Sequence, residues 1–364
     1  MVGTVLLQRM VDQGDLATME TVLFSQTQQG QPCPAWLATA GVDLPPVHDG
    51  NDIDQLVEMD VLLSCQGSEY TRTMLPRLRK AGWQGYWLDA AAQLRMSDEA
   101  VIALDPVNRA VIDQALATGI KNFCGGNCTV SLMLLATGGL FAHGLVEWIS
   151  TMTYQAASGA GARAIRELLH GMGTLHAEVA DALNDPHSAI LAIDRKAGEV
   201  LLGNKLDNSV LKAPLVGSLI PYIDAAYGDG RSREEWKGEV ETHRILGDSG
   251  PVIPIDGLCV RVGSLRSHAQ ALTIKLTRDL PLDDLAAIIA QANDWVEVVA
   301  DEPEPSRLHL TPAATSGTLK IPIGRLRKMR MGPEFLSAFT VGDQLLWGAA
   351  EPLRRMLGIL RDGL

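Results

Sequence analysis

The sequence predicts an α/β fold in two parts: a parallel, doubly wound sheet, and then an α+β part with a mixed, largely antiparallel sheet. Up to residue 127, short apolar strand patterns alternate with helical patterns, which favours parallel strands joined by crossover helices. After that point, a long alternating segment at 145–156 is typical of a half-buried antiparallel strand. The 364 residues suffice for two domains with full cores.

Each element of the first part follows from its local pattern. Apolar residues recur at helical spacing from Val2 to Val11, so the chain opens in a helix that no strand or cap precedes. The stretch 30–54 is rich in Gly, Pro, Asp and Gln and predicts loop with at most weak strand. The other predicted strands are 21–25, 61–65, 85–89 and a lead-in at 121–123, and the other predicted helices are 67–81 and 107–119.

The second part changes in character. A long helix is predicted over 160–183, and the Gly, Pro and Asp residues of 184–230 predict a largely irregular segment. The remaining predicted helices are 232–246, 282–292 and 344–360, and the remaining predicted strands are 258–262, 269–276, 318–323 and 335–341.

Composition excludes several classes of protein. The net charge of −12 argues against a nucleic-acid binder, which usually has a basic face. Five scattered cysteines without a CxxC pair indicate neither a disulfide framework nor a zinc site. The start lacks a signal-peptide pattern, and the uncharged run 122–146 carries polar residues and glycines that favour strand, turn and buried helix over a membrane span. We expect a soluble, cytoplasmic protein with no metal.

The stretch Asn122–Val130 carries the strongest chemical signal. A short apolar segment ends in Gly125 and Gly126, and Cys128 follows where a helix should begin. A helix N-terminus favours the thiolate form, which is the nucleophile, and the glycines leave room for a substrate. A buried structural cysteine is the alternative, because free cysteine is among the most buried residue types.

Three further segments carry polar groups in suggestive places. The segment 154–161 ends a strand and opens a helix, and its Gly and Ser residues leave backbone N–H groups near a ligand. Glu234 and Lys237 lie one turn apart on one predicted helix face. Arg261 and His268 place a guanidinium and an imidazole between two strands.

Together these segments resemble the aspartate-β-semialdehyde dehydrogenases of Gram-negative bacteria, over the whole chain. The motifs that carry the resemblance are GGNCTVS at 125–131, TYQAASG at 153–159, EEWKG at 234–238, DGLCVRVG at 256–263 and FTVGDQLLWG at 339–348.

The resemblance implies a fold and an activity. The fold is a Rossmann-type NADP-binding domain at 1–127, completed by the helix at 345–364, and a catalytic and dimerisation domain at 128–344. The activity is the NADP-dependent, phosphorylating interconversion of aspartate semialdehyde with aspartyl phosphate through a cysteine thioester. This step feeds lysine, methionine, threonine and diaminopimelate synthesis, and the enzyme is a homodimer.

The resemblance also implies residue roles. Cys128 is the expected nucleophile, His268 the general acid/base with a pKa near 7, and Gln155 a group that orients the acyl intermediate. Arg261 would hold the substrate α-carboxylate and Glu234 its ammonium group. The expected phosphate ligands are Arg95, Asn127 and Lys237, and the expected cofactor contacts are Met1, Val2, Ser25, Gln26, Thr27, Gln66, Ser158, Gly159, Gly161 and Gln344. Taken singly, such charged residues are most often solvated surface groups, and Ser25 and Thr27 also suit a simple turn.

The N-terminus departs from the family pattern. The family begins with a strand and a Gly-rich turn that cradles the cofactor pyrophosphate, and here only Met1–Gly3 matches the end of that turn. Either the natural chain is longer, or this is a short form with impaired NADP binding. No acidic residue ends the strand at 21–25, which agrees with NADP rather than NAD.

Two other functions remain open. A related N-acetyl-glutamyl-phosphate reductase would share the cysteine chemistry, but it would not need Glu234, because an acetylated amine carries no charge. A catalytically impaired homodimeric scaffold is the other alternative. The basic run 325–330 could then serve a subunit interface, although such a run is most simply a solvated face.

Overall fold

The computed structural model describes residues 1–247 and 250–363. By their internal contacts these residues form two compact units. The first comprises 1–131, 241–251 and 345–364, and the second comprises 132–240 and 252–344. Each unit has its own sheet, described separately below.

The first unit is built on a parallel four-stranded sheet. Its strands, in spatial order, are β3 (Val61–Ser64), β4 (Tyr86–Asp89), β6 (Asn122–Gly125) and β5 (Ala100–Ala103). The predicted parallel, doubly wound part is therefore confirmed. Sequence patterns predicted three of these strands and missed β5, although it is no shorter than the other three.

Helices cover both faces of this sheet. Leu62 and Trp87 are register partners and pack under α4 (Ser68–Lys80) in one apolar cluster. The next pair in register, Leu63 and Leu88, faces the opposite side. There Leu88 and Phe123 pack against α5 (Asp105–Ala117) and α13 (Glu351–Gly363). The period-2 alternation of strand side chains thus assigns each helix to its face.

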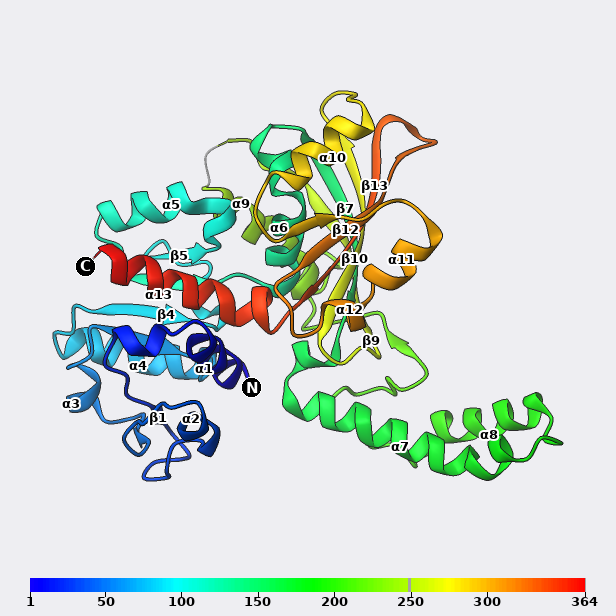
Figure 1. Ribbon diagram of the computed structural model, residues 1–364, viewed down its shortest axis with the longest axis horizontal. Helices are drawn as coiled ribbons and strands as arrows, with labels where there is room; N and C mark the ends of the chain where they lie inside the picture. The colour runs from blue at the N-terminus through cyan, green and yellow to red at the C-terminus, as the bar shows by residue number, and fades with distance from the viewer. Residues whose placement is uncertain (248–249, 364) are drawn as a thin grey trace. The chain divides into compact units, whose positions relative to one another are not determined.

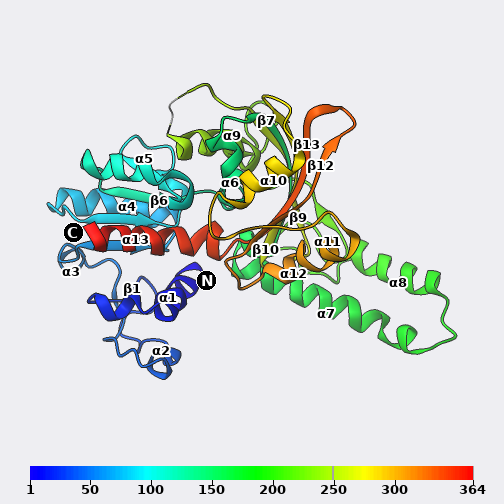
Figure 2. The same ribbon diagram turned by 45° about the horizontal axis from the view of Figure 1, so that its top comes forward.

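The C-terminal helix is tied to the start of the chain. Helix α13 lies beside α1 (Val2–Asp12), as Figures 1 and 2 both show. The buried carboxylate of Glu351 accepts from Arg9 Nε at 3.0 Å and from Arg354 Nε at 3.1 Å. Arg354 also donates to Asp15 at 2.9 Å. These paired charges fix the two helices without leaving an uncompensated buried ion.

A small separate sheet lies in the same unit. Strand β1 (Phe24–Ser25) pairs in parallel with β2 (His48–Asp49), and neither joins the four-stranded sheet. The strand predicted at 21–25 is thus reduced to its last two residues. The prediction of loop with at most weak strand at 30–54 is wrong in part, because this stretch contains the short helix α2 (Ala35–Thr39), and α3 (Ile53–Leu56) begins at its end. The short helices η1 (Asp15–Thr18) and η2 (Ala92–Leu94) complete this part of the unit.

The second unit contains a mixed seven-stranded sheet, as predicted. Its strands, in spatial order, are β11 (Val296–Val298), β12 (Ile321–Met329), β13 (Gly332–Asp343), β10 (Ser267–Leu276), β7 (Val146–Gln155), β9 (Ile255–Val262) and β8 (Leu219–Ile220). Antiparallel pairs join β12 to β13, β13 to β10, β10 to β7 and β9 to β8, while β7–β9 and β11–β12 are parallel.

One prediction for the second unit is wrong. Residues 184–230, predicted as irregular, contain the helix α8 (Ile190–Leu202), which packs against α7 (Ala162–Asn184) to form a helical hairpin (Figure 1). Val200 and Leu168 share a buried cluster, so contact with α7 supports a helix whose flanking Gly, Pro and Asp residues suggested loop.

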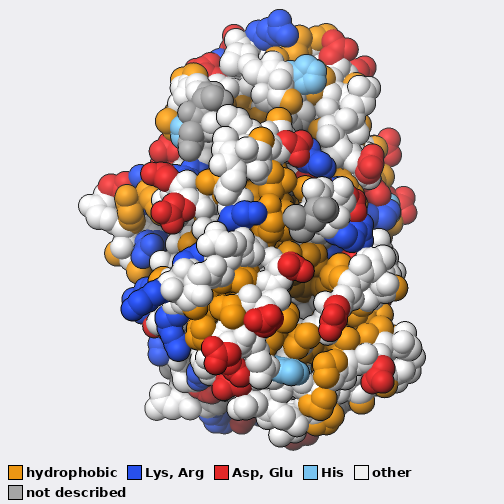
Figure 3. Space-filling model, turned by 90° about the vertical axis from the view of Figure 1, so that its left-hand side faces the viewer, with side chains coloured by type: hydrophobic (Ala, Val, Ile, Leu, Met, Phe, Trp, Pro, Cys, Tyr) orange, Lys and Arg blue, Asp and Glu red, His pale blue; other side chains and the backbone are white. Residues whose placement is uncertain are grey.

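The remaining elements are helical. They are α6 (Cys128–Ala142), η3 (Ala157–Ala160), α9 (Arg233–Leu246), α10 (Leu282–Ala290), α11 (Pro303–His309), α12 (Pro312–Thr315) and η4 (Leu346–Ala350). No helix within the described residues is long and apolar enough to cross a membrane. Figure 3 shows acidic and basic side chains interspersed on one face of the molecule.

We predict that Gly257→Ala destabilises the second unit. Gly257 is paired with Thr151 across the β7–β9 ladder, and an added Cβ would fall on the Thr151 carbonyl, which the ladder holds in place. Overpacking of this kind should cost about 3 kcal/mol of unfolding free energy. The matched control is Gly173→Ala in α7, where an added Cβ meets no atom. Equal thermal midpoints for the two variants would contradict the strand pairing.

Candidate active site

Cys128 is the first residue of α6, as the sequence predicted. Strand β6 ends at Gly125, so only two residues separate the buried sheet from the helix. Asn127 Oδ1 accepts from the backbone N–H groups of Thr129 at 2.9 Å and Val130 at 3.3 Å, which caps the helix. Cys128 is partly exposed, whereas Cys124 and Cys259 are buried. Of these three thiols, Cys128 is therefore the accessible one.

Gly126 has a steric reason for lacking a side chain. A Cβ there would lie 2.9 Å from Ser131 Oγ and 3.2 Å from Ile102 Cγ2. The turn into α6 therefore passes so close to the first helical turn and to β5 that only glycine fits. This contact fixes the path of the chain directly before Cys128.

Arg95 lies next to this turn. Its Nε donates to the Gly125 carbonyl at 2.8 Å, and its Nη1 donates to Glu241 at 3.0 Å. Burial alone would lower the pKa of Arg95, but the charge and hydrogen bond of Glu241, together with charge on Cys124 and Cys128, raise the pKa above its usual value. The guanidinium therefore places a permanent positive charge near the thiol.

In the second unit, three predicted site residues form one hydrogen-bonded chain. Gln155 Nε2, at the end of β7, donates to Glu234 at 3.2 Å, and Lys237 Nζ donates to Glu234 at 3.0 Å. Lys237 also donates to Asp224 at 2.8 Å. Burial would lower the pKa of Lys237, but Glu234 and Asp224 together raise it. Within the described residues, two of the three N–H donors of the ammonium group go to these carboxylates, so one can serve a phosphate.

His268 is fully buried on β10, and its hydrogen bonding assigns its tautomer. The Ala156 backbone N–H donates to Nδ1 at 3.0 Å, so Nδ1 carries no proton. Burial is the main cause that lowers the pKa of His268 to about 3, and the positive charge of Arg261 is the second cause. The ring is therefore neutral at pH 7 with its proton on Nε2, and Nε2 has no partner among the described residues. The expected pKa near 7 is wrong, because the expectation left out burial and Arg261.

Arg261 and His268 meet at Gly159. Arg261 Nη1 donates to the Ala156 carbonyl at 2.8 Å, so the peptide groups of Ala156 contact both side chains. A Cβ on Gly159 would lie 2.7 Å from Arg261 Nη1 and 3.2 Å from His268 Nε2. Gly159, predicted as a cofactor contact, therefore also leaves the space that the guanidinium and the imidazole occupy.

The remaining predicted cofactor residues fall into two groups. In the first unit, Thr27 N–H donates to Ser25 Oγ at 3.3 Å, and Gln26 donates to Asn51 at 3.1 Å, so this segment forms a local turn. In the second unit, Gln344 Nε2 donates to Ser158 Oγ at 2.8 Å. Gly161 has a φ of 92° directly before α7, a conformation that favours glycine. Gln66 follows β3, and Met1 and Val2 begin α1.

The carboxyl edge of the parallel sheet fits a dinucleotide. The first turn of α1 lies there, because a Cβ on Gly3 would be 3.4 Å from Cys65 Cβ, directly after β3. Within the described part of the chain, no side chain caps the N-terminus of α1 or α4, so their N–H groups suit a pyrophosphate. Ser64 Oγ, at the end of β3, is buried without a partner among the described residues.

Sequence reasoning missed Glu241 and Asp224. Glu241 lies four residues after Lys237 on α9, and continuing the Glu234–Lys237 face by one turn would have found it. Asp224 lies in an irregular segment, where no periodicity identifies it.

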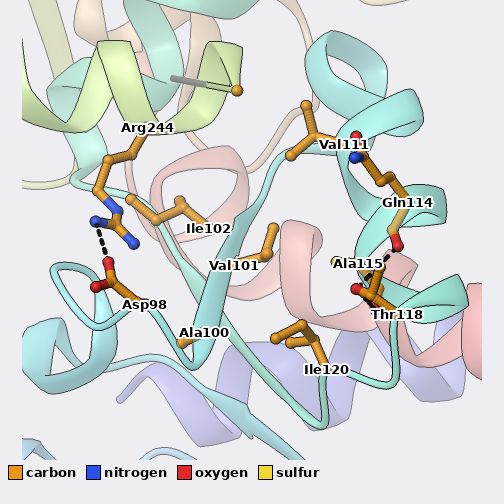
Figure 4. Close-up of a pocket in the computed structure, with 11 residues that line it drawn as sticks. Asp98, Ala100, Val101, Ile102, Val111, Gln114, Ala115, Thr118, Ile120 and Arg244 are labelled. Carbon is orange, nitrogen blue, oxygen red and sulfur yellow. Dashed lines mark hydrogen bonds and ion pairs between the residues drawn. The ribbon is translucent and has the colours of Figure 1, made fainter. Parts of the chain in front are cut away.

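A cavity of about 280 Å³ in the first unit is lined by none of the predicted site residues. It lies beside β5 and α5, with the Arg244–Asp98 ion pair at one end (Figure 4). The hydrogen bonding around Cys128 therefore defines the candidate site better than cavity size does.

We predict that His268 stays neutral from pH 8 to pH 5. Its pKa of about 3 lies below this window, and the Ala156 N–H keeps the proton on Nε2. Nitrogen NMR of the histidine-labelled protein should show an Nε2-protonated ring without titration, and His268→Gln assigns the signal. A midpoint between pH 6 and pH 7 would overturn the assignment.

Comparison with known proteins adds independent evidence. Residues 138–347 match the model of the semialdehyde dehydrogenase dimerisation domain, and residues 1–115 match that of the semialdehyde dehydrogenase NAD binding domain. The aspartate semialdehyde dehydrogenase from Francisella tularensis is 43% identical with a TM-score of 0.92, over 99% of this chain and 97% of that chain.

More distant solved structures share the fold. The aspartate semialdehyde dehydrogenase II from Vibrio cholerae, complexed with ASA, is 20% identical with a TM-score of 0.79, over 100% of this chain and 96% of that chain. The Candida albicans enzyme with NADP is 16% identical with a TM-score of 0.64, over 99% of this chain and 96% of that chain. The two domain models and the Francisella match establish that this chain belongs to the aspartate semialdehyde dehydrogenase family.

Proposed function

We propose that the protein interconverts L-aspartate 4-semialdehyde and phosphate with L-aspartyl 4-phosphate, using NADP. The observation that carries this proposal is the accessible Cys128 at the start of α6, whose charge would interact favourably with the Arg95 guanidinium. A helix N-terminus and a nearby guanidinium both favour a thiolate, and a thiolate is the nucleophile that such a reaction requires. Family membership favours this reaction over the N-acetyl-glutamyl-phosphate reductase and scaffold alternatives.

The reaction begins with attack of the Cys128 thiolate on the aldehyde carbon. The sulfur–carbon bond forms as the carbonyl double bond opens, which leaves negative charge on the substrate oxygen. The role that we assign to His268 follows from its tautomer: neutral Nε2–H donates a hydrogen bond to this oxygen. A neutral imidazole cannot give up that proton fully at ordinary pH, so His268 stabilises charge rather than releasing a proton.

The second stage turns the adduct into an acyl phosphate. NADP, when bound, accepts the hydride that leaves the substrate carbon. The carbonyl re-forms as a thioester on Cys128, and we expect Gln155 to orient it. A phosphate oxygen then attacks the thioester carbon, the carbon–sulfur bond breaks, and the thiolate is regenerated.

Two buried charged residues suit the amino-acid end of the substrate. We propose that Arg261 binds the α-carboxylate, since a guanidinium matches a carboxylate with two parallel hydrogen bonds. Glu234 binds the ammonium group, and Lys237 and Asp224 accompany it in the same network. Arg95, Asn127 and Lys237 bind phosphate in this proposal.

Cofactor contacts, assembly and compartment complete the proposal. The turn Ser25–Thr27 offers hydroxyl and amide groups and no carboxylate, which suits a 2′-phosphate and hence NADP. Met1, Val2, Gln66, Ser158, Gly159, Gly161 and Gln344 are the other cofactor contacts that we propose. We also propose a homodimer formed through the second unit. All five cysteines are free thiols, which suits the reducing cytoplasm.

The test is phosphate-dependent reduction of NADP with aspartate semialdehyde. After its first turnover, the unsubstituted protein should continue to reduce NADP only when phosphate or arsenate is present. Cys128→Ala should abolish this activity, since no other group can hold the acyl intermediate. Cys33→Ala removes a thiol outside the proposed site and serves as the control. Substantial turnover by Cys128→Ala would refute the covalent route, and no turnover by the unsubstituted protein would refute the proposed reaction.

A further inference from the structure

Glu241 is a buried carboxylate to which the proposed reaction assigns no role. It lies on α9 and is 2% exposed. A buried carboxylate is costly unless hydrogen bonds and opposite charge compensate it. The partners that compensate Glu241 therefore indicate what the residue does.

The two oxygens of Glu241 have different partners. Oε1 accepts from Arg95 Nη1 at 3.0 Å, and Oε2 accepts from the Asn127 backbone N–H at 2.6 Å. Arg95 also donates to the carbonyl of Gly125 at 2.8 Å. Arg95 is thus held at two points, and Glu241 joins its guanidinium to the Gly126–Asn127 peptide, in the turn that leads to Cys128.

We infer that Glu241 is a positioning residue, which holds the Arg95 guanidinium and the Asn127 peptide in the arrangement that receives phosphate beside Cys128. This inference rests on the proposed function, because it assumes that Arg95 and Asn127 bind phosphate. Within the described part of the chain, two of the five N–H groups of Arg95 have protein partners, so others are left to bind an anion.

Glu241 could act in two ways: it could hold the Arg95 side chain in place, or it could neutralise the charge of Arg95. The substitution Glu241→Gln distinguishes these two roles. The glutamine oxygen can still accept from Asn127, but its amide NH₂ would then face the guanidinium, donor against donor. Arg95 would keep its charge and lose one of its two anchors. If neutralisation were what mattered, removing the carboxylate charge would strengthen phosphate binding. If holding Arg95 in place is what matters, the substitution weakens phosphate binding.

The experiment compares four proteins with the unsubstituted enzyme: Glu241→Gln, Arg95→Ala, the double variant and Glu239→Gln. The last makes the same charge change on the same helix, at a residue other than the Gly125 and Glu241 partners that the structure gives Arg95. Three quantities are measured: the KM for phosphate, the rate of the first hydride transfer without phosphate, and the thermal midpoint.

We expect Glu241→Gln to raise the phosphate KM about tenfold, the effect of losing one charge-assisted hydrogen bond. The first hydride transfer without phosphate should change little. The thermal midpoint should fall, because the largely buried Arg95 guanidinium loses its carboxylate partner. In the Arg95→Ala background, Glu241→Gln should have no further effect on the phosphate KM. Glu239→Gln should match the unsubstituted enzyme.

Other outcomes would overturn the inference. An unchanged or lower phosphate KM in Glu241→Gln would contradict a positioning role. So would an equal change in the phosphate KM when Glu241→Gln is made in the unsubstituted enzyme and in the Arg95→Ala background. A parallel fall in first-turnover rate and thermal midpoint would assign Glu241 to stability alone. Failure of the unsubstituted enzyme to show phosphate-dependent turnover would count against the proposed function, a result distinct from a failure of Glu241.

Discussion

The transition from strand β6 to helix α6 is the constraint on which the nucleophile depends. Asn127 Oδ1 accepts hydrogen bonds from the N–H groups of Thr129 and Val130, in the first turn of the helix. Gly126 allows the turn to pass against Ser131 and Ile102. These contacts determine where α6 begins, and its first residue is Cys128. A helix that began one turn earlier or later would remove the thiol from the helix N-terminus, where its anionic form is stabilised.

Buried polar groups hold the other site residues. In the second unit, the peptide groups of Ala156 contact both His268 and Arg261. Gln155, Glu234 and Lys237 form a continuous chain that ends at Asp224. Such networks keep charged groups in place because each unpaired member would carry a large desolvation cost. Preorganised donors of this kind stabilise charge that develops during a reaction without having to reorganise.

Local patterns predicted the features that depend on neighbours in sequence. The start of α6 at Cys128, the alternating strand β7 and the helix α9 all have a period or a turn signal that one segment contains. Helix α8 was missed because its support comes from α7. Strand β5 was also missed, although it is as long as β3, β4 and β6, which the patterns did predict. The residue roles came from motif resemblance, and periodicity alone would not have supplied them.

Electrostatic features depend on the tertiary structure and could not be predicted in the same way. The pKa of about 3 for His268 arises from complete burial and from Arg261, seven residues away in sequence but adjacent in the fold. Glu241 acquires its partners only when α9 meets the turn that contains Asn127. A sequence shows which face of a helix carries a residue, but it does not show which groups of the folded protein that residue will contact.

The central claim is that Cys128 carries the acyl group. The most direct measurement is peptide mass mapping after the protein reacts with aspartate semialdehyde and NADP in the absence of phosphate. The account predicts one aspartyl adduct, on the peptide that contains Cys128, and its loss when phosphate is added. Phosphate-dependent turnover without this adduct, or an adduct on another cysteine that phosphate discharges, would contradict the account.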